Sequence, residues 1–182
     1  HHGMYETNLR VPLIMHHPDR TPSGLHLPGL GRHQDLPVTL LDLLEVDGAG
    51  EEAGMEGVSM APLMDNANPA GTCDRVFITE NAWMKKRGFR TKKWKFIKSL
   101  YDELHKRPPY ELYDLTVDPE EQSNLADELP EIRDAFDRDL EAYVQKRMDE
   151  TGNPDPQSYQ DITLTHVGNV EIAVPEEQVL EE

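Results

Sequence analysis

The chain of 182 residues has one cysteine, few basic residues and no long apolar run. The lone Cys73 excludes an internal disulfide and any zinc site built from several cysteines. Only 18 lysines and arginines stand against 35 aspartates and glutamates, and the formal net charge of -17 argues against general attraction to nucleic acid or to an anionic membrane surface. No apolar run approaches the ~18 residues of a membrane-spanning helix. We therefore expect neither nucleic acid nor a membrane as a partner.

The beginning of the sequence is typical of the cut end of a longer protein. The chain starts with His1 rather than methionine, and no signal-peptide pattern follows. Residues 11–15 form a short, continuous apolar run, which predicts a buried strand soon after this start. We therefore interpret the chain as a carboxy-terminal fragment. The alternative is that His1 and His2 are the remnant of a purification tag.

The first half of the chain contains one clear helix signal. Asp35 is a suitable cap, Pro37 fits the first turn, and the leucines between residues 36 and 44 supply an apolar face. This helix should end before Asp47-Gly48. The following residues to position 73 should be mostly loop, with a short ordered piece at residues 57–64.

The second half predicts a small sheet covered by a helix. Residues 75–80, 88–100 and 110–115 are expected to be strands of an antiparallel meander. A helix should open near Pro130 and pack one face on the sheet, because its apolar residues recur at helical spacing. They are Ile132, Phe136, Leu140, Tyr143 and Val144.

Beyond position 150 the sequence becomes an acidic tail. Residues 162–167 and 170–174 could pair as a hairpin around Gly168-Asn169. We accordingly predict three regions: residues 1–73, residues 74–150 and the tail of residues 151–182.

A basic run interrupts the acidic sequence in the predicted sheet. Eight of the 18 cationic residues lie in it: Lys85, Lys86, Arg87, Arg90, Lys92, Lys93, Lys95 and Lys98. One interpretation is a patch that attracts an anionic substrate or polymer. We favour the solvent-exposed face of an edge hairpin, because Lys93 and Lys95 flank Trp94 with a period of two, and lysine discourages pairing of strand edges. Trp94 itself is assigned to the core, and Glu120-Glu121 and the acidic residues of 134–141 to a solvated helix face.

The amino-terminal cluster carries the candidate chemistry. His1 and His2 precede the predicted strand at residues 11–15, where a turn can be held over a pocket. Imidazole can donate a hydrogen bond to an anionic oxygen, or give a proton to a leaving group near neutral pH. Glu6 and Arg10 can form an ion pair that holds the turn.

This cluster resembles the sulfatase family. In that family a lysine or histidine precedes a small turn, then Tyr-Glu, Arg-x-Pro and an apolar strand, as in residues 1–15 here. Residues 34–42 resemble the family's Asp-Ile-x-Pro-Thr-Leu-Leu-Asp helix, with Pro37 one place early, and residues 57–63 resemble its Gly-x-Ser-Leu-x-Pro-Leu loop. The family's carboxy-terminal strand pair and turn have similar counterparts in residues 90–97, 111–115, 118–121 and 124–125. The four blocks keep the family's order over residues 1–145, and the tail matches nothing.

The resemblance implies an α/β fold: the end of an alkaline-phosphatase-like α/β domain in residues 1–73, followed by a small antiparallel sheet packed by a carboxy-terminal helix. Such enzymes attack sulfur with a formylglycine made from cysteine or serine, beside a calcium ion or another divalent cation. The Cys/Ser-x-Pro-x-Arg motif and the metal-binding aspartates are absent from the sequence, and Cys73 has no proline two residues on. We therefore expect the metal to be bound by residues upstream and none in this chain.

The resemblance also assigns roles to the cluster. His1 stands where many members place a lysine that contacts the sulfate and the leaving-group oxygen, and His2 is the next candidate. We predict the carboxy-terminal part of a sulfatase acting on a small-molecule or saccharide sulfate ester. His1 and His2 are the predicted catalytic and substrate-binding residues, with Glu6 and Arg10 supporting the loop. The chain alone should be inactive.

Two other functions stay open at this point. One is a phosphate or phosphonate ester hydrolase of the same superfamily. The other is a non-catalytic module that binds an anion through the basic hairpin of residues 85–98.

Overall fold

The computed structural model describes residues 3–64, 71–82, 84–100, 107–159, 166–167 and 170–171. The chain divides into two compact units. One, which we call the helical unit, comprises residues 11–76; the other, the sheet unit, comprises residues 1–10 together with residues 77–182. The amino-terminal turn therefore groups with the sheet.

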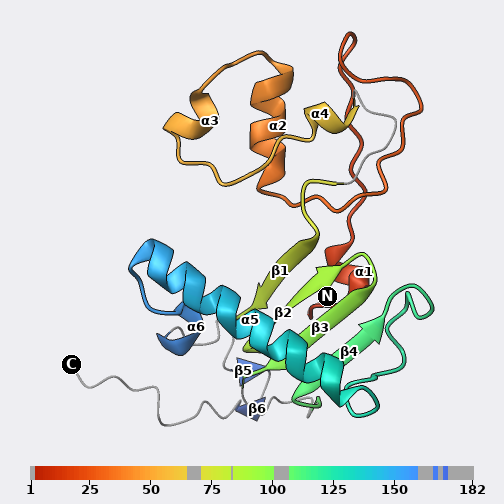
Figure 1. Ribbon diagram of the computed structural model, residues 1–182, viewed down its shortest axis with the longest axis vertical. Helices are drawn as coiled ribbons and strands as arrows, with labels where there is room; N and C mark the ends of the chain where they lie inside the picture. Colours follow the sequence, from red (N-terminus) through yellow and green to blue (C-terminus); the bar gives the residue numbers. More distant parts are fainter. Residues whose placement is uncertain are drawn as a thin grey trace. The chain divides into compact units, whose positions relative to one another are not determined.

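The sheet has four strands in the order β1 (Arg75–Glu80), β2 (Lys86–Thr91), β3 (Trp94–Ser99) and β4 (Tyr110–Asp114) (Figure 1). The pairs β2–β3 and β3–β4 are antiparallel. The strands predicted at residues 75–80 and 110–115 are confirmed. The single strand predicted at residues 88–100 is wrong, because the chain reverses at Lys92-Lys93.

The reversal is held by one side chain. The Thr91 hydroxyl accepts hydrogen bonds from the backbone N–H groups of Trp94 at 2.8 Å and Lys93 at 3.3 Å. The predicted strand at residues 88–100 is therefore two strands of a hairpin.

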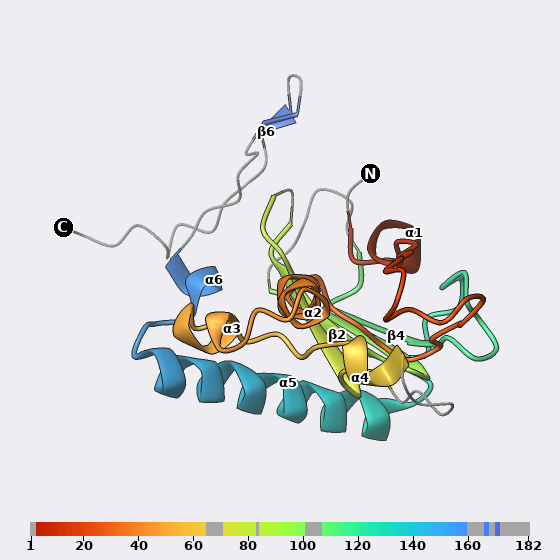
Figure 2. The ribbon, with the colours of Figure 1, turned by 90° about the horizontal axis from the view of Figure 1, so that it is seen from above.

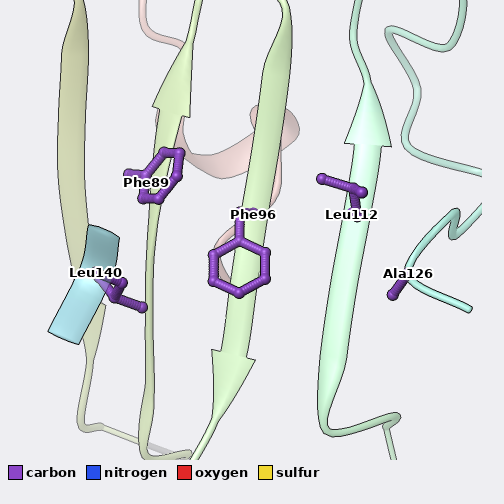
Figure 3. Packing of buried hydrophobic residues seen from close by; sticks show 5 residues of the cluster. All are labelled: Phe89, Phe96, Leu112, Ala126 and Leu140. Carbon is purple, nitrogen blue, oxygen red and sulfur yellow. The ribbon is translucent and has the colours of Figure 1, made fainter. Parts of the chain in front are cut away.

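The helix α5 (Pro130–Thr151) covers one face of the sheet, as predicted (Figures 1 and 2). Side chains from three neighbouring strands meet Leu140 of α5 in the core, with Ala126 at its edge (Figure 3). Phe89, Phe96 and Leu112 are the strand members of this core. Trp94 packs against the core, which confirms its assignment. Although α5 has 22 residues, no helix in the described part of the chain has the apolar length needed to cross a membrane.

The opposite face of the sheet is polar. Side chains alternate between the faces of a strand, so Lys95 and Glu111 point away from the core that Phe96 and Leu112 enter. The short helix α1 (Glu6–Leu9) lies on this second face, with α5 on the other side of the sheet (Figure 2). We call this surface the polar face of the sheet.

The helical unit contains α2 (Asp35–Leu43), α3 (Ala49–Glu52) and α4 (Ala61–Met64). The predicted helix at residues 35–44 is confirmed, but Asp35 does not cap it, since Gln34 holds the cap position. The buried Asp35 carboxylate instead accepts backbone N–H groups from Arg32 at 2.8 Å and Val58 at 2.9 Å. The Thr72 hydroxyl also donates to it, so one side chain joins three loops.

The strand predicted at residues 11–15 is wrong. This segment has no strand assignment, and Ile14 is 92% exposed. A strand needs hydrogen-bonded neighbours and a buried face, and none of the strands in the described residues pairs with it. Cys73 is partly buried and forms an isolated antiparallel bridge with Leu30.

Beyond α5 the residues that the structure describes form a short helix and a short hairpin. The helix α6 (Pro156–Tyr159) follows α5, and β5 (His166–Val167) pairs antiparallel with β6 (Val170–Glu171). This pairing confirms the predicted hairpin over its described residues. The turn at positions 168–169 and the remaining tail lie outside the described residues.

Candidate functional site

The amino-terminal turn, residues 3–10, is compact and ordered around α1. Gly3 has a φ of 116°, a backbone conformation that favours glycine. The Asn8 side-chain amide donates to the Gly3 carbonyl at 3.1 Å, and Met4 is buried. His1 and His2 lie outside the described residues, so their catalytic and substrate-binding roles stay predictions.

Glu6 provides the first anchor of this turn. Its carboxylate lies 2.8 Å from the ammonium of Lys95 and 3.1 Å from the guanidinium Nε of Arg90. The backbone N–H of Glu6 donates to the carboxylate of Glu121 at 2.6 Å. Lys95 and Arg90 thus supply two cations to two carboxylates, and the cluster can be neutral overall.

Lys95 lies at the centre of this first anchor. Its side chain is fully buried, and its ammonium donates to the Met4 carbonyl at 2.9 Å. The ammonium also lies 3.4 Å from Glu121. A buried charge is tolerated only when it is paired and hydrogen-bonded, and the partners of Lys95 come from the amino-terminal turn and from Glu121.

The two carboxylates of this anchor have opposite pKa shifts. Burial favours the neutral form of Glu6, but hydrogen bonds and charge from Lys95 and Arg90 outweigh it and hold the pKa of Glu6 below its usual value. Burial raises the pKa of Glu121, although the Glu6 amide and Lys95 act against the shift. Ionised Glu6 is therefore the favoured partner of the two cations.

Tyr5 provides the second anchor. Its hydroxyl donates to the buried carboxylate of Glu111 at 2.6 Å, and the Tyr113 hydroxyl donates to the same oxygen at 2.8 Å. Lys86 donates to the other oxygen at 3.1 Å. Burial and the hydrogen bond to Glu111 raise the pKa of Tyr113, which keeps its phenol protonated. Two consecutive residues of the turn are thus bound to the polar face of the sheet.

The predicted ion pair between Glu6 and Arg10 is wrong. Glu6 turns its carboxylate to Arg90 and Lys95, while Arg10 is exposed and donates only its backbone N–H to the Glu6 carbonyl, at 2.9 Å. The sheet supplies the better partners, because the buried Lys95 needs a close anionic partner and Glu6 is nearer to it than Glu121 is.

Neither interpretation of the basic run, an anion-attracting patch or a solvent-exposed face, fits the residues of the run that are buried. Lys85, Lys86, Arg87 and Lys95 are buried. Arg87 pairs with Asp155, and Lys98 on the helix-covered face pairs with Asp137 and Glu141 of α5. The run is therefore mainly an internal set of ion pairs. Glu121 and Asp137 were expected on a solvated face, but Glu121 is buried and Asp137 is only partly exposed. Glu141 is exposed as expected, although it also pairs with Lys98.

The sequence analysis missed Lys95, Glu111 and Glu121 as residues that hold the turn. Strand alternation could have placed Lys95 opposite Phe96 on the polar face. No local pattern indicates that Met4 and Glu6 cover that face, since Met4 is 91 positions away from Lys95.

The polar face does not fit a divalent cation. Glu6 and Glu121 already share Lys95, so little negative charge is left for a metal. Among the described residues no group of three or more histidine, cysteine, aspartate or glutamate side chains could hold a metal ion.

Comparison with known proteins identifies the class. The family model described as "N-sulphoglucosamine sulphohydrolase, C-terminal" matches residues 1–150. The chain belongs to this family of sulfatase carboxy-terminal domains, which confirms the resemblance noted in the sequence.

Individual relatives agree with this assignment. Arylsulfatase K of Rattus norvegicus is 31% identical over 151 residues, which cover 78% of this chain and 26% of the relative. Choline-sulfatase of Rhizobium meliloti is 29% identical over 125 residues, covering 69% of this chain and 23% of the relative. The chain thus spans about a quarter of the length of these curated relatives.

A solved structure shares the fold. The crystal structure of yidJ from Bacteroides fragilis superimposes with a TM-score of 0.55 at 21% identity, over 77% of this chain and 29% of that one. This likeness shows the fold, an α/β arrangement ending in an antiparallel sheet covered by a helix.

Proposed function

We propose that this chain is the carboxy-terminal part of an enzyme that hydrolyses a sulfate ester of a small molecule or a saccharide. The observation that carries the proposal is the family match over residues 1–150, which includes the amino-terminal turn. The names of the family and of one relative, N-sulphoglucosamine sulphohydrolase and choline-sulfatase, support both substrate classes.

In this proposal the turn presents His1 and His2 to the substrate. A protonated imidazole donates a hydrogen bond to a sulfate oxygen, or gives its proton to the departing ester oxygen. Glu6 supports the turn through Arg90 and Lys95, and Arg10 supports it through its backbone bond to Glu6. None of these supporting groups needs to touch the substrate.

The attacking group lies outside this chain in our proposal. The resemblance implies a formylglycine nucleophile and a calcium ion or another divalent cation, and we assign both to sequence that precedes His1. When bound, the cation would stabilise the sulfate oxygens. Glu6 and Glu121 remain partners of Lys95 and are not proposed as ligands.

An activity assay tests whether the attacking group and the metal site lie upstream of this chain. We expect no turnover of an aryl sulfate by the 182-residue chain, and turnover by a longer protein that includes the upstream coding sequence. In the longer protein, His1→Ala and His2→Ala should lower turnover by roughly 10²-fold or more, as loss of an acid–base group does.

The chain offers a matched control. His16 and His17 form a second adjacent histidine pair in an exposed loop of the helical unit, and alanine at both positions should leave turnover unchanged. Turnover by the 182-residue chain that survives loss of both His1 and His2 would contradict the assigned roles.

The same assays separate the other functions. A phosphate ester hydrolase would turn over an aryl phosphate faster than the sulfate, and its upstream nucleophile would be an unmodified serine or threonine. An anion-binding module would be retained on heparin in a salt-sensitive manner. We expect weak retention, because Lys86, Arg87 and Lys95 are buried in ion pairs.

A further inference from the structure

Strand β3 carries two lysines on opposite faces, and each is paired with two carboxylates. Lys98 contacts Asp137 and Glu141, both at 2.7 Å, and so joins the strand to α5. Lys95 contacts Glu6 and Glu121, and so joins the strand to the amino-terminal turn. The two lysines make similar contacts, but only Lys95 reaches the segment that directly follows the candidate catalytic residues His1 and His2.

Glu121 has an unusual backbone for its residue type. Its φ of 54° lies in the left-handed region, which few residues other than glycine adopt. At this position the side chain is almost fully buried, and its carboxylate accepts the Glu6 backbone N–H. A strained conformation persists where the surrounding structure over-determines it, often at a functional site.

We propose that Lys95 and Glu121 are positioning residues of the enzyme. Lys95 fixes the Met4 carbonyl and the Glu6 carboxylate, and Glu121 fixes the Glu6 amide. Met4 follows His2 by two residues, so these bonds set the point from which the chain leads back to both histidines. Neither residue touches the substrate. The positioning of the two histidines for catalysis rests on the proposed function, whereas the attachment of the turn to the sheet does not.

The first experiment uses amide hydrogen exchange of the 182-residue chain to measure how firmly the amino-terminal turn is held on the sheet. We expect Glu121→Gly to raise the exchange rate of the Glu6 amide at least tenfold, since its acceptor is lost. The strands should keep their protection, because glycine adopts the backbone of position 121 without strain. Lys95→Met should have the same effect on residues 4–10.

Lys98→Met is the matched control. It removes a lysine with two carboxylate partners from the same strand, so it should loosen α5 and leave the turn protected. Unchanged exchange of residues 4–10 in both Glu121→Gly and Lys95→Met would overturn the proposal. If Lys95→Met does not fold, Glu121→Gly still decides it.

The second experiment measures catalysis in the longer protein. A displacement of about 1 Å in a catalytic group can cost roughly 10²-fold in rate. We therefore expect Glu121→Gly to lower kcat for an aryl sulfate by about 10- to 100-fold with a smaller change in KM. Glu121→Gln should restore much of the loss, because its amide oxygen can still accept the Glu6 N–H. Lys98→Met should keep its kcat.

Different results would contradict the proposed function and the positioning role of Lys95 and Glu121. A longer protein without sulfatase activity would contradict the proposed function and leave the exchange result standing. An active longer protein whose kcat is unchanged in Glu121→Gly, although the turn exchanges faster, would refute the positioning role.

Discussion

The two units bury their side chains in different ways. The 12 aromatic residues all lie in the sheet unit, where Phe89, Phe96 and Leu112 are fully buried. The helical unit has no aromatic residue and contains nine of the 11 large apolar side chains that are exposed among the described residues, including Ile14 and Leu44. The sheet unit is therefore held by a close-packed core. The helical unit has a smaller core of Leu43, Met60, Ala61 and Met64, and the polar contacts of Asp35 join its loops.

The largest expected difference between the units is in amide hydrogen exchange. We expect amides of residues 11–64 to exchange faster than those of β2–β4, because few apolar side chains cover them. Residues 4–10 should be protected with the sheet, since Glu6 and Lys95 bind them to it. Exchange measured by mass spectrometry checks this order, and the opposite order would contradict the division into units.

Phe96→Ala should destabilise the sheet unit most among single substitutions. Phe96 is fully buried and its ring contacts those of Phe89, Phe136 and Tyr110. Loss of a buried phenylalanine costs about 3–5 kcal/mol. Denaturant unfolding followed by tryptophan fluorescence measures the change, and a loss below about 1 kcal/mol would show that the core is not what holds this unit.

Asp35→Ala should affect the helical unit alone. It removes the acceptor of Arg32, Val58 and Thr72, and breaking such a buried ionic network costs about 3 kcal/mol. Faster exchange in residues 30–64 with unchanged exchange in β2–β4 is the expected result. Asp42→Ala on the same helix is the control, because the Asp42 carboxylate is only partly buried and its contacts are a hydrogen bond from Ser59 and a 3.7 Å ion pair with Arg20.

Acid should have a smaller effect on the same unit. Burial favours neutral Asp35, but hydrogen bonds from Arg32, Thr72 and Val58 hold its pKa below the ordinary value of 3.8. The unfolded chain then takes up the proton first, so stability is lost as the pH falls below about 4. Asp35→Asn should remove this pH dependence. The methyl resonances of Met60 and Met64 report it, and identical pH profiles for the two proteins would exclude Asp35 as the cause.

Lys98→Met should give the smallest loss. The pKa of Lys98 is raised. Burial disfavours its charge, but hydrogen bonds and charge from Asp137 and Glu141 outweigh the effect of burial. The pair is partly exposed, so we expect a loss of about 1 kcal/mol in the sheet unit. A loss as large as that of Phe96→Ala would mean that ion pairs, and not the aromatic core, dominate this unit.

Local patterns predicted the elements that bury a regular face. The helical spacing of Ile132, Phe136 and Leu140 identified α5, alternation identified β1, and β4 was predicted around Leu112. The same reasoning failed for residues 11–15, where an apolar run was read as buried although most of its side chains are exposed. An apolar run indicates that its side chains favour burial, but it does not indicate whether a neighbouring strand is present to pair with it.

The candidate site was predicted only in part. Motif order placed the candidate turn at residues 1–10, and in the structure Glu6 joins it to Arg90 and Lys95 and not to Arg10. The partners Lys95 and Glu111 were not foreseen, because their role depends on contacts with distant segments of the chain. Charge counting along the sequence treated Lys95 as a surface residue, whereas the fold encloses it.

Cys73 makes it possible to follow the helical unit separately from the sheet unit. Its thiol belongs to the helical unit and sits at the bridge to Leu30, half-buried. Because it is the one sulfhydryl of the sequence, its alkylation rate reports the opening of that unit alone. Tryptophan emission reports the other unit, since Trp94 packs against its core. A single untagged sample therefore contains two intrinsic probes, one for each half of the molecule.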